Sequence, residues 1–262
     1  TAKLDYLKEL GVDSIWLTPI VENIPQNVGS ATDGEYYAYH GYWALNFEEL
    51  NPHLGSLADF HELIDAAAEK GINIIVDVVL NHAGYGAEET FEGMVRTKEE
   101  DKQGDDELGS LSGLPDFKTE EATVRNQLVA WQASWLKRST TAKGNSIYGF
   151  RVDTVKHVDD TTWQHFKNEL VDRDPDFHLI GESWGANYKD TKGDLGIGTM
   201  DSLLDFGFKD IAKYLVNGQL KAAGKELEER SKVLTSAASL GQFLGSHDED
   251  GFLYSLGGAE KE

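Results

Sequence analysis

The feature that most constrains the fold is a repeated switch between helical and extended hydrophobic patterns along the chain. The clearest example starts at Ser56, which together with Asp59 makes a capping-box-like helix start, and the helix that follows ends at Gly71. Residues 72–80 then form a run rich in β-branched residues, as a strand covered on both faces requires. Helices that alternate with such strands are typical of βα units around a parallel sheet.

The same alternation recurs over most of the chain, so we predict one large α/β domain. The predicted strands cover residues 14–17, 72–80, 147–153, 178–181, 202–206 and 240–244. The other predicted helices cover 2–10, 120–138 and 162–171, and a further helical stretch ends near residue 233. Trp131 and Trp135 recur at helical spacing, and we interpret them as core residues rather than as a sugar-binding platform.

Charge and cysteine content exclude several classes of partner. The 262 residues carry a formal net charge of −22, which repels phosphate backbones and anionic lipid surfaces. No run of about 18 apolar residues is present that could span a membrane. We therefore expect neither nucleic acid nor a membrane as partner, and we expect a monomer. The absence of cysteine excludes disulfides but does not fix the compartment.

Two long segments, 21–52 and 83–116, interrupt the alternation of helices and strands. Loops of this length inside a compact α/β unit usually carry function. The second segment is rich in acids and poor in large apolar residues. We interpret it as a small, solvated excursion inserted between a strand and the helix that follows.

Acidic, basic and histidine side chains gather where the predicted strands end. In a parallel βα architecture the carboxyl ends of the strands meet at one face, where function collects. The side chains delivered there are Asp77, Asn81, His82, Arg151, Asp153, Lys156, His157, Glu182, His247 and Asp248. Burying three acids from three different strands is costly unless the acids take part in function.

Arg151 and Asp153 are two residues apart on one predicted strand, so they point to the same face. Taken alone, the pair is explained as well by a structural ion pair as by catalysis. Hydrolysis of a glycoside needs one ionised and one neutral carboxyl group. Arg151 favours the charged form of Asp153, whereas Glu182 has no basic neighbour in sequence and is followed by Trp184, which favours a raised pKa.

Six motifs carry a resemblance that covers nearly the whole chain. They are YHGYW (39–43), DVVLNH (77–82), LPDF (114–117), GFRVDTVKH (149–157), GESW (181–184) and FLGSHD (243–248). In this order they resemble the signature regions of the α-amylase family, glycoside hydrolase family thirteen. The resemblance implies a (β/α)8 TIM-type barrel over 1–262 that lacks its first and last strands, with 83–116 as a reduced inserted domain. Because an open sheet exposes unpaired edges, we expect a fragment of a longer enzyme.

The resemblance also implies the roles of the site residues. Asp153 is the nucleophile, Glu182 is the general acid/base, and Asp248 is a third acid that helps to hold and distort the sugar ring. Arg151 orients Asp153 with help from Asp77. The residues expected to bind substrate are His40, Tyr42, Trp43, His82, Arg151, Lys156, His157 and His247.

Individual substrate contacts follow from the same resemblance. Tyr42 would stack on the sugar ring, with His40 and Trp43 as its supports. His82 and His247 would hydrogen-bond the hydroxyl groups of that ring. Lys156 and His157 would face the leaving-group side.

A calcium ion between the barrel and the excursion is a further implication of the resemblance. Asn81, Asp116 and the backbone carbonyl of His157 would supply part of its oxygen shell. The alternative interpretation is that Asn81 and Asp116 only cap turns.

The implied activity is retaining endo-hydrolysis of α-1,4-glucosidic bonds in starch-like glucans, with an α-glucan or malto-oligosaccharide as the bound partner. The motif LPDF favours α-amylase-type action. A transglycosylating, maltogenic or debranching relative is the first alternative, since such enzymes use the same acids, and a non-catalytic glucan-binding or partner subunit is the second. We favour an extracellular, secreted enzyme over a cytoplasmic one, although the chain opens without a signal peptide.

Overall fold

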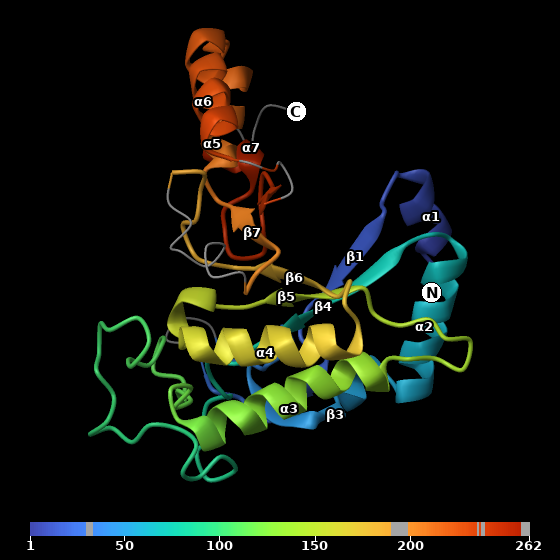
Figure 1. Ribbon diagram of the computed structural model, residues 1–262, viewed down its shortest axis with the longest axis vertical. Helices are drawn as coiled ribbons and strands as arrows, with labels where there is room; N and C mark the ends of the chain where they lie inside the picture. The colour runs from blue at the N-terminus through green and yellow to red at the C-terminus, as the bar shows by residue number, and fades with distance from the viewer. Residues whose placement is uncertain (30–33, 190–198, 235, 237–238, 258–262) are drawn as a thin grey trace. The chain divides into compact units, whose positions relative to one another are not determined.

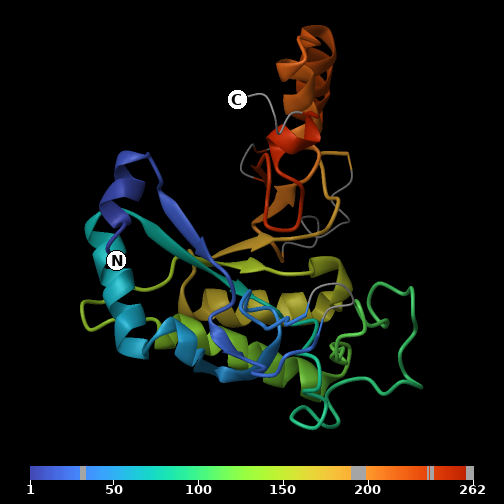
Figure 2. The ribbon, with the colours of Figure 1, turned by 180° about the vertical axis from the view of Figure 1, so that it is seen from behind.

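The computed structural model describes residues 1–29, 34–189, 199–234, 236 and 239–257. The chain divides into two compact units, Thr1–Leu179 and Ile180–Glu262. Figures 1 and 2 show the elements of both units from opposite sides. In the described part of the chain, no helix combines the length and the apolar character that crossing a membrane demands.

The first unit is built on parallel strands that the sequence predicts. They are β1 (Ser14–Leu17), β4 (Asn73–Val78) and β5 (Gly149–Val152), hydrogen-bonded in that order. All residues of β4 except Asn73 are buried, as expected of a strand covered on both faces. The register places Asp77 beside Arg151, so polar side chains of neighbouring strands meet at the carboxyl ends.

Helices precede, separate or follow these strands in the chain. They are α1 (Leu4–Glu9), α2 (Leu57–Glu69), α3 (Ala122–Arg138) and α4 (Asp160–Arg173). The predicted capping box of α2 is confirmed, because the Ser56 hydroxyl accepts from the Asp59 amide at 3.2 Å and the Asp59 carboxylate accepts from the Ser56 amide at 2.7 Å.

Helix α3 packs through the tryptophans that the sequence analysis assigned to the core. The Trp135 indole donates to the carbonyl of Phe47 at 2.9 Å, and the Trp131 ring stacks 5.7 Å from the Phe47 ring. Gln132 donates to the carbonyl of Val79 at 2.8 Å, which ties the helix to the chain that follows β4. The interpretation of Trp131 and Trp135 as packing residues is therefore confirmed.

The first long segment contains a β-hairpin that the sequence analysis missed. Strand β2 (Val21–Asn23) pairs antiparallel with β3 (Ala44–Leu50), with irregular register, and a 3₁₀ turn, η1 (Pro52–Leu54), follows. The pattern is weak because β2 has three residues and β3 carries polar side chains. Phe47 of β3 packs against α3, so the hairpin belongs to the core of this unit.

The excursion 83–116 consists of turns and isolated bridges. His82 bridges to Asp116 and Val95 bridges to Phe117, both antiparallel. Phe91 packs its ring edge against Phe117 at 5.2 Å, which gives the segment a small apolar base. In Figures 1 and 2 the green chain of the excursion extends past the ends of α3 and α4.

The second unit contains the strands β7 (Ser202–Asp205) and β8 (Leu240–Gln242). Strand β6 (His178–Gly181) precedes them, and its first two residues are the last of the first unit. All three pair parallel. The single helical stretch predicted to end near residue 233 is two helices, α5 (Phe208–Val216) and α6 (Leu220–Val233), because Gly218 adopts φ 71° between them. A short helix, α7 (Phe252–Ser255), follows β8. Arg230 of α6 is buried and pairs with Asp205 of β7 at 3.1 Å.

Gly41→Ala is expected to destabilise the first unit strongly. Gly41 has φ 92°, and a Cβ atom there would lie 2.6 Å from the carbonyl oxygen of Pro19. Backbone strain and this collision together should lower the free energy of unfolding by about 2–4 kcal/mol, measured by urea unfolding. The matched control is Gly93→Ala, since Gly93 has φ 77° but no atom within 4 Å of the added Cβ. It should lose only about 1–2 kcal/mol, and equal losses in both variants would refute the collision.

Candidate active site

The centre of the first unit's site is a guanidinium shared by two carboxylates. Arg151 Nη1 donates to both oxygens of Asp77 at 3.0 Å and to Oδ1 of Asp153 at 2.5 Å. The Arg151 side chain is 2% exposed and that of Asp153 is 10% exposed. Strand β5 presents Arg151, and Asp153 follows at its end, so the predicted alternation places both groups as expected.

Two aromatic residues from earlier segments complete this cluster. The Tyr42 hydroxyl donates to Asp77 Oδ2 at 2.6 Å, and the Trp16 indole donates to the same oxygen at 3.1 Å. The guanidinium carbon of Arg151 also lies 4.8 Å from the centre of the Trp16 ring. The sequence analysis did not select Trp16, although an indole N–H near the carboxyl end of a parallel strand is a signal for such a contact.

Burial sets the protonation of this cluster. It raises the pKa of Asp77 to about 7, with Arg151 acting in the opposite direction and Asp153 in the same one. Burial, with Asp77 second, also raises the pKa of Tyr42. Tyr42 therefore stays protonated at neutral pH and can donate its hydroxyl hydrogen to Asp77.

His40, which was expected to support Tyr42, contacts both its backbone and its ring, and Trp43 in turn contacts His40. The Tyr42 amide donates to Nδ1 of His40 at 3.0 Å, and the two rings stack with 5.9 Å between centres. The Trp43 ring meets the His40 ring edge-on at 4.5 Å. Trp43, Tyr36 and Tyr85 line a pocket of about 620 Å³ beside this loop.

His82 is buried behind the same loop. Its Nε2 lies 3.2 Å from the carbonyl oxygen of Tyr42, and its Nδ1 lies 3.3 Å from the side-chain nitrogen Nδ2 of Asn81. These partners fit a neutral ring that accepts at Nδ1 and donates at Nε2. Burial lowers the pKa of His82, which agrees with the neutral form.

The loop after β5 connects the site to the excursion. Thr154 has φ 49°, and the 3₁₀ turn η2 (Val155–His157) follows it. Lys156 Nζ lies 3.6 Å from Oδ1 of Asp106, and His157 Nδ1 lies 2.7 Å from the carbonyl oxygen of the same residue. Lys156 and His157 thus both contact the excursion through Asp106.

The remaining predicted residues belong to the second unit. Glu182 directly follows β6 and is 6% exposed, and Trp184 packs its ring 4.9 Å from Phe206. His247 Nε2 lies 3.1 Å from Oδ2 of Asp248, in the loop after β8. The structure therefore brings Asp153 together with Arg151, Asp77 and Tyr42 in one unit, and places Glu182, His247 and Asp248 at strand ends of the other.

Asp116, the one carboxylate expected to bind calcium, is paired with a guanidinium instead. Asp116 is 2% exposed, and its Oδ2 accepts from Arg96 Nε at 2.8 Å. Burial raises the pKa of Asp116 to about 7, and Arg96 opposes this effect. Calcium needs six to eight oxygen ligands and is repelled by a cation, whereas the guanidinium of Arg96 lies directly beside Asp116. Throughout the described residues, no three His, Cys, Asp or Glu side chains are grouped to hold a metal ion.

Relatives of this chain are found among curated proteins. The periplasmic alpha-amylase of Escherichia coli K12 is 27% identical over 347 residues, which cover 95% of this chain and 49% of that protein. Neopullulanase 2 of Thermoactinomyces vulgaris is 26% identical over 280 residues, which cover 98% of this chain and 44% of that protein. The chain thus spans about half the length of the curated relatives it matches.

A solved structure shows which fold this chain shares. The alpha-amylase of Geobacillus thermoleovorans, in complex with acarbose, is 31% identical and matches with a TM-score of 0.80 over 97% of this chain and 56% of that one. The fold is that of the alpha-amylase type of TIM barrel, present here in part. The family description "Alpha amylase, catalytic domain" matches residues 1–105 and 108–262, and this chain therefore belongs to the alpha-amylase catalytic-domain family.

Proposed function

We propose that the protein containing this chain is a retaining glycoside hydrolase that cleaves internal α-1,4 bonds of starch-like glucans. Asp153 acts as the nucleophile, Glu182 as the general acid/base, and Asp248 as the third acid. The observation that carries the proposal is the clamp on Asp153, whose Oδ1 accepts from a buried Arg151 that Asp77 holds in turn. A carboxylate fixed in this way is suited to attack one atom of a bound substrate.

The reaction has two steps. In the first, Asp153 attacks the anomeric carbon while Glu182 gives its proton to the leaving glycosidic oxygen, so that the C–O bond breaks and a glycosyl ester of Asp153 forms. In the second, water attacks the same carbon, Glu182 accepts the proton of that water, and the ester bond to Asp153 breaks. Two inversions leave the configuration of the anomeric carbon unchanged.

The surroundings of Asp153 support binding of a sugar ring. Tyr42 is held at both ends, by Asp77 at its hydroxyl and by His40 at its amide, so its ring can present a fixed apolar face. His82 is buried beside it, and its Nε2 lies 3.2 Å from the carbonyl oxygen of Tyr42, so it helps to hold the loop that presents this ring. The aromatic pocket formed by Tyr36, Trp43 and Tyr85 extends the same kind of surface.

The α-amylase subtype rests on the motif LPDF at 114–117. A transglycosylating, maltogenic or debranching action is the alternative, because such enzymes use the same three acids, and the small residues Gly245 and Ser246 before His247 are compatible with a more open acceptor side. Product analysis after incubation with soluble starch distinguishes the two. A ladder of linear malto-oligosaccharides supports endo-hydrolysis, whereas cyclic, transferred or exclusively maltose products support the alternative.

Asp153→Asn and Glu182→Gln in the full-length protein are each expected to lower starch hydrolysis by about a thousandfold or more. Release of reducing ends from soluble starch measures the loss, and circular dichroism checks that the fold is intact. Asp172→Asn, an exposed acid on α4, is the matched control and should keep wild-type turnover. More than about a tenth of wild-type turnover in either site variant would show that the role has been misassigned.

The first-formed product is expected to be the α-anomer. Double displacement at the anomeric carbon retains the configuration of the substrate bond. Proton NMR in the first minutes of hydrolysis, before mutarotation, reads the anomeric signal directly. Initial formation of the β-anomer would rule out Asp153 as a covalent nucleophile.

Asp77→Asn is expected to change how stability depends on pH. The pKa of Asp77 is raised to about 7 in the folded state, against about 4 in an unfolded chain, so between these values the native state holds a proton that the unfolded state has lost. This contribution to wild-type stability is complete below about pH 4 and is lost as pH rises to about 7. Asn removes the effect.

Urea unfolding over this pH range measures the free energy of unfolding of both proteins. The wild-type value minus the Asp77→Asn value should decline up to about pH 7 and stay constant above it. The exposed Asp172→Asn serves again as control and should run parallel to the wild type. A difference for Asp77→Asn that does not change with pH would contradict the raised pKa.

A further inference from the structure

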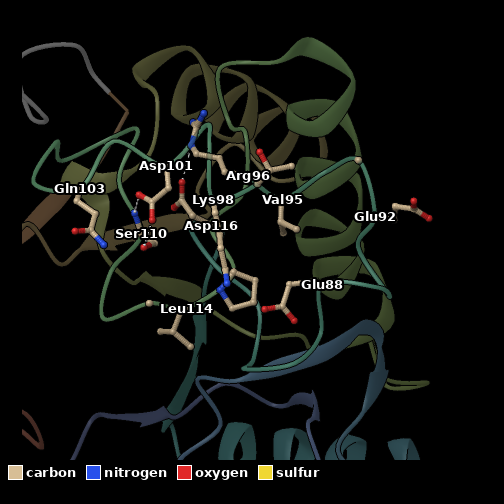
Figure 3. A pocket seen from close by; sticks show the side chains of 14 residues that line it. Glu88, Glu92, Val95, Arg96, Lys98, Asp101, Gln103, Ser110, Leu114 and Asp116 are labelled. Carbon is tan, nitrogen blue, oxygen red and sulfur yellow. Dashed lines mark hydrogen bonds and ion pairs between the residues drawn. The ribbon is translucent and has the colours of Figure 1, made fainter.

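Arg96 is the most completely paired cation of the excursion. Its side chain is 6% exposed, and its Nε donates to Oδ2 of Asp116 at 2.8 Å. Its Nη1 and Nη2 donate to the two oxygens of Glu120 at 2.8 and 2.6 Å, which is the bidentate geometry of a strong ion pair. Figure 3 shows Arg96 reaching Asp116 at the wall of a pocket of about 840 Å³ in the excursion.

These contacts connect three parts of the chain that are distant from one another in sequence or separated by turns. Arg96 lies in the middle of the excursion, Asp116 lies at its end, and Glu120 lies just before the start of α3. The Arg96 amide also donates to the carbonyl oxygen of Asp116 at 2.7 Å. One residue therefore fixes the excursion to its own end and to the helix that follows.

Three other acids of the excursion, Glu100, Asp101 and Asp105, accept hydrogen bonds from donors of the protein itself. Glu100 pairs with Lys118 at 2.8 Å, and Asp101 accepts from the amide and hydroxyl of Ser110 at 2.9 and 2.7 Å. Asp105 accepts from the amides of residues 107 and 108. These three side chains are therefore held by contacts within the protein.

We propose that Arg96 is the cation that anchors the excursion, at the place where the family resemblance leads one to expect calcium. A guanidinium carries a permanent charge and a planar set of donors that matches two carboxylates at once. A calcium ion about 2.4 Å from Asp116 would meet this guanidinium within a few ångströms, and the two cations would repel each other. The fold of the excursion is consequently independent of bound calcium.

Two contacts connect the excursion to the loops that carry the site residues. Asp116 bridges to His82, and Asp106 contacts both Lys156 and His157. The position of Arg96 is therefore linked to the loops after β4 and β5. This inference does not depend on the proposed hydrolase activity, because its tests measure stability and local cleavage.

The test compares melting temperatures of the full-length protein after exhaustive chelation and with millimolar calcium added. Wild type should differ by less than about 1 °C between the two conditions, and elemental analysis should find calcium well below one ion per chain. Arg96→Met should lower the melting temperature by about 5 °C or more, because it leaves a buried carboxylate without its partner. Arg173→Met is the matched control, since the Arg173 pair with Glu169 is exposed, and it should change by about 1 °C or less.

Limited trypsin digestion provides a local readout. Lys98 and Lys102 are exposed in the excursion, and cleavage after them should be faster in Arg96→Met than in wild type and in Arg173→Met. If Arg96→Met does not fold, Arg96→Lys replaces it and should give a smaller loss of melting temperature with the same faster cleavage. A wild-type melting temperature that falls on chelation, or Arg96 variants that behave like Arg173→Met, would overturn the proposal.

Discussion

The first unit depends on how one buried guanidinium is shared. Arg151 faces Asp77 and Asp153, so a single positive charge is balanced against two carboxyl groups in a place with little water. Burial of this kind is costly unless hydrogen bonds accompany it, and here the strands β4 and β5, the loop of Tyr42 and the strand of Trp16 supply donors to the Asp77 carboxylate. The arrangement fixes Asp153 because its neighbours cannot move independently.

The sequence predicted the elements whose pattern is strong over several residues. The buried run of β4 and the spacing of Arg151 and Asp153 on β5 predicted both strands and the common face of these side chains. The β2–β3 hairpin was missed because its strands are short, irregular in register and partly polar. The break between α5 and α6 was missed because Gly218 interrupts a pattern that is otherwise continuous on both sides.

The meeting of Asp77, Arg151 and Asp153 at the strand ends could be predicted, because each lies in a motif on a strand with a strong pattern. The contacts made by residues of irregular segments could not be predicted in this way. Arg96 and Asp116 are 20 residues apart in a chain of turns, and no periodicity connects them, so composition and spacing could not show that a guanidinium meets that carboxylate. Trp16 was missed for a related reason, since the oxygen it contacts is 61 residues further along the chain.

The separation in sequence of the groups around Asp77 also bears on how the protein folds. Contacts at separations of 35, 61 and 74 residues, made by Tyr42, Trp16 and Arg151, converge on this one carboxylate. Each contact closes a long loop, and such contacts contribute only after the entropy of loop closure has been lost. During synthesis the cluster is incomplete until β5 has emerged from the ribosome. A nascent chain that stops earlier would carry an acid meant for burial without its counter-charge, so this strand end cannot be buried at low cost before β5 has been made.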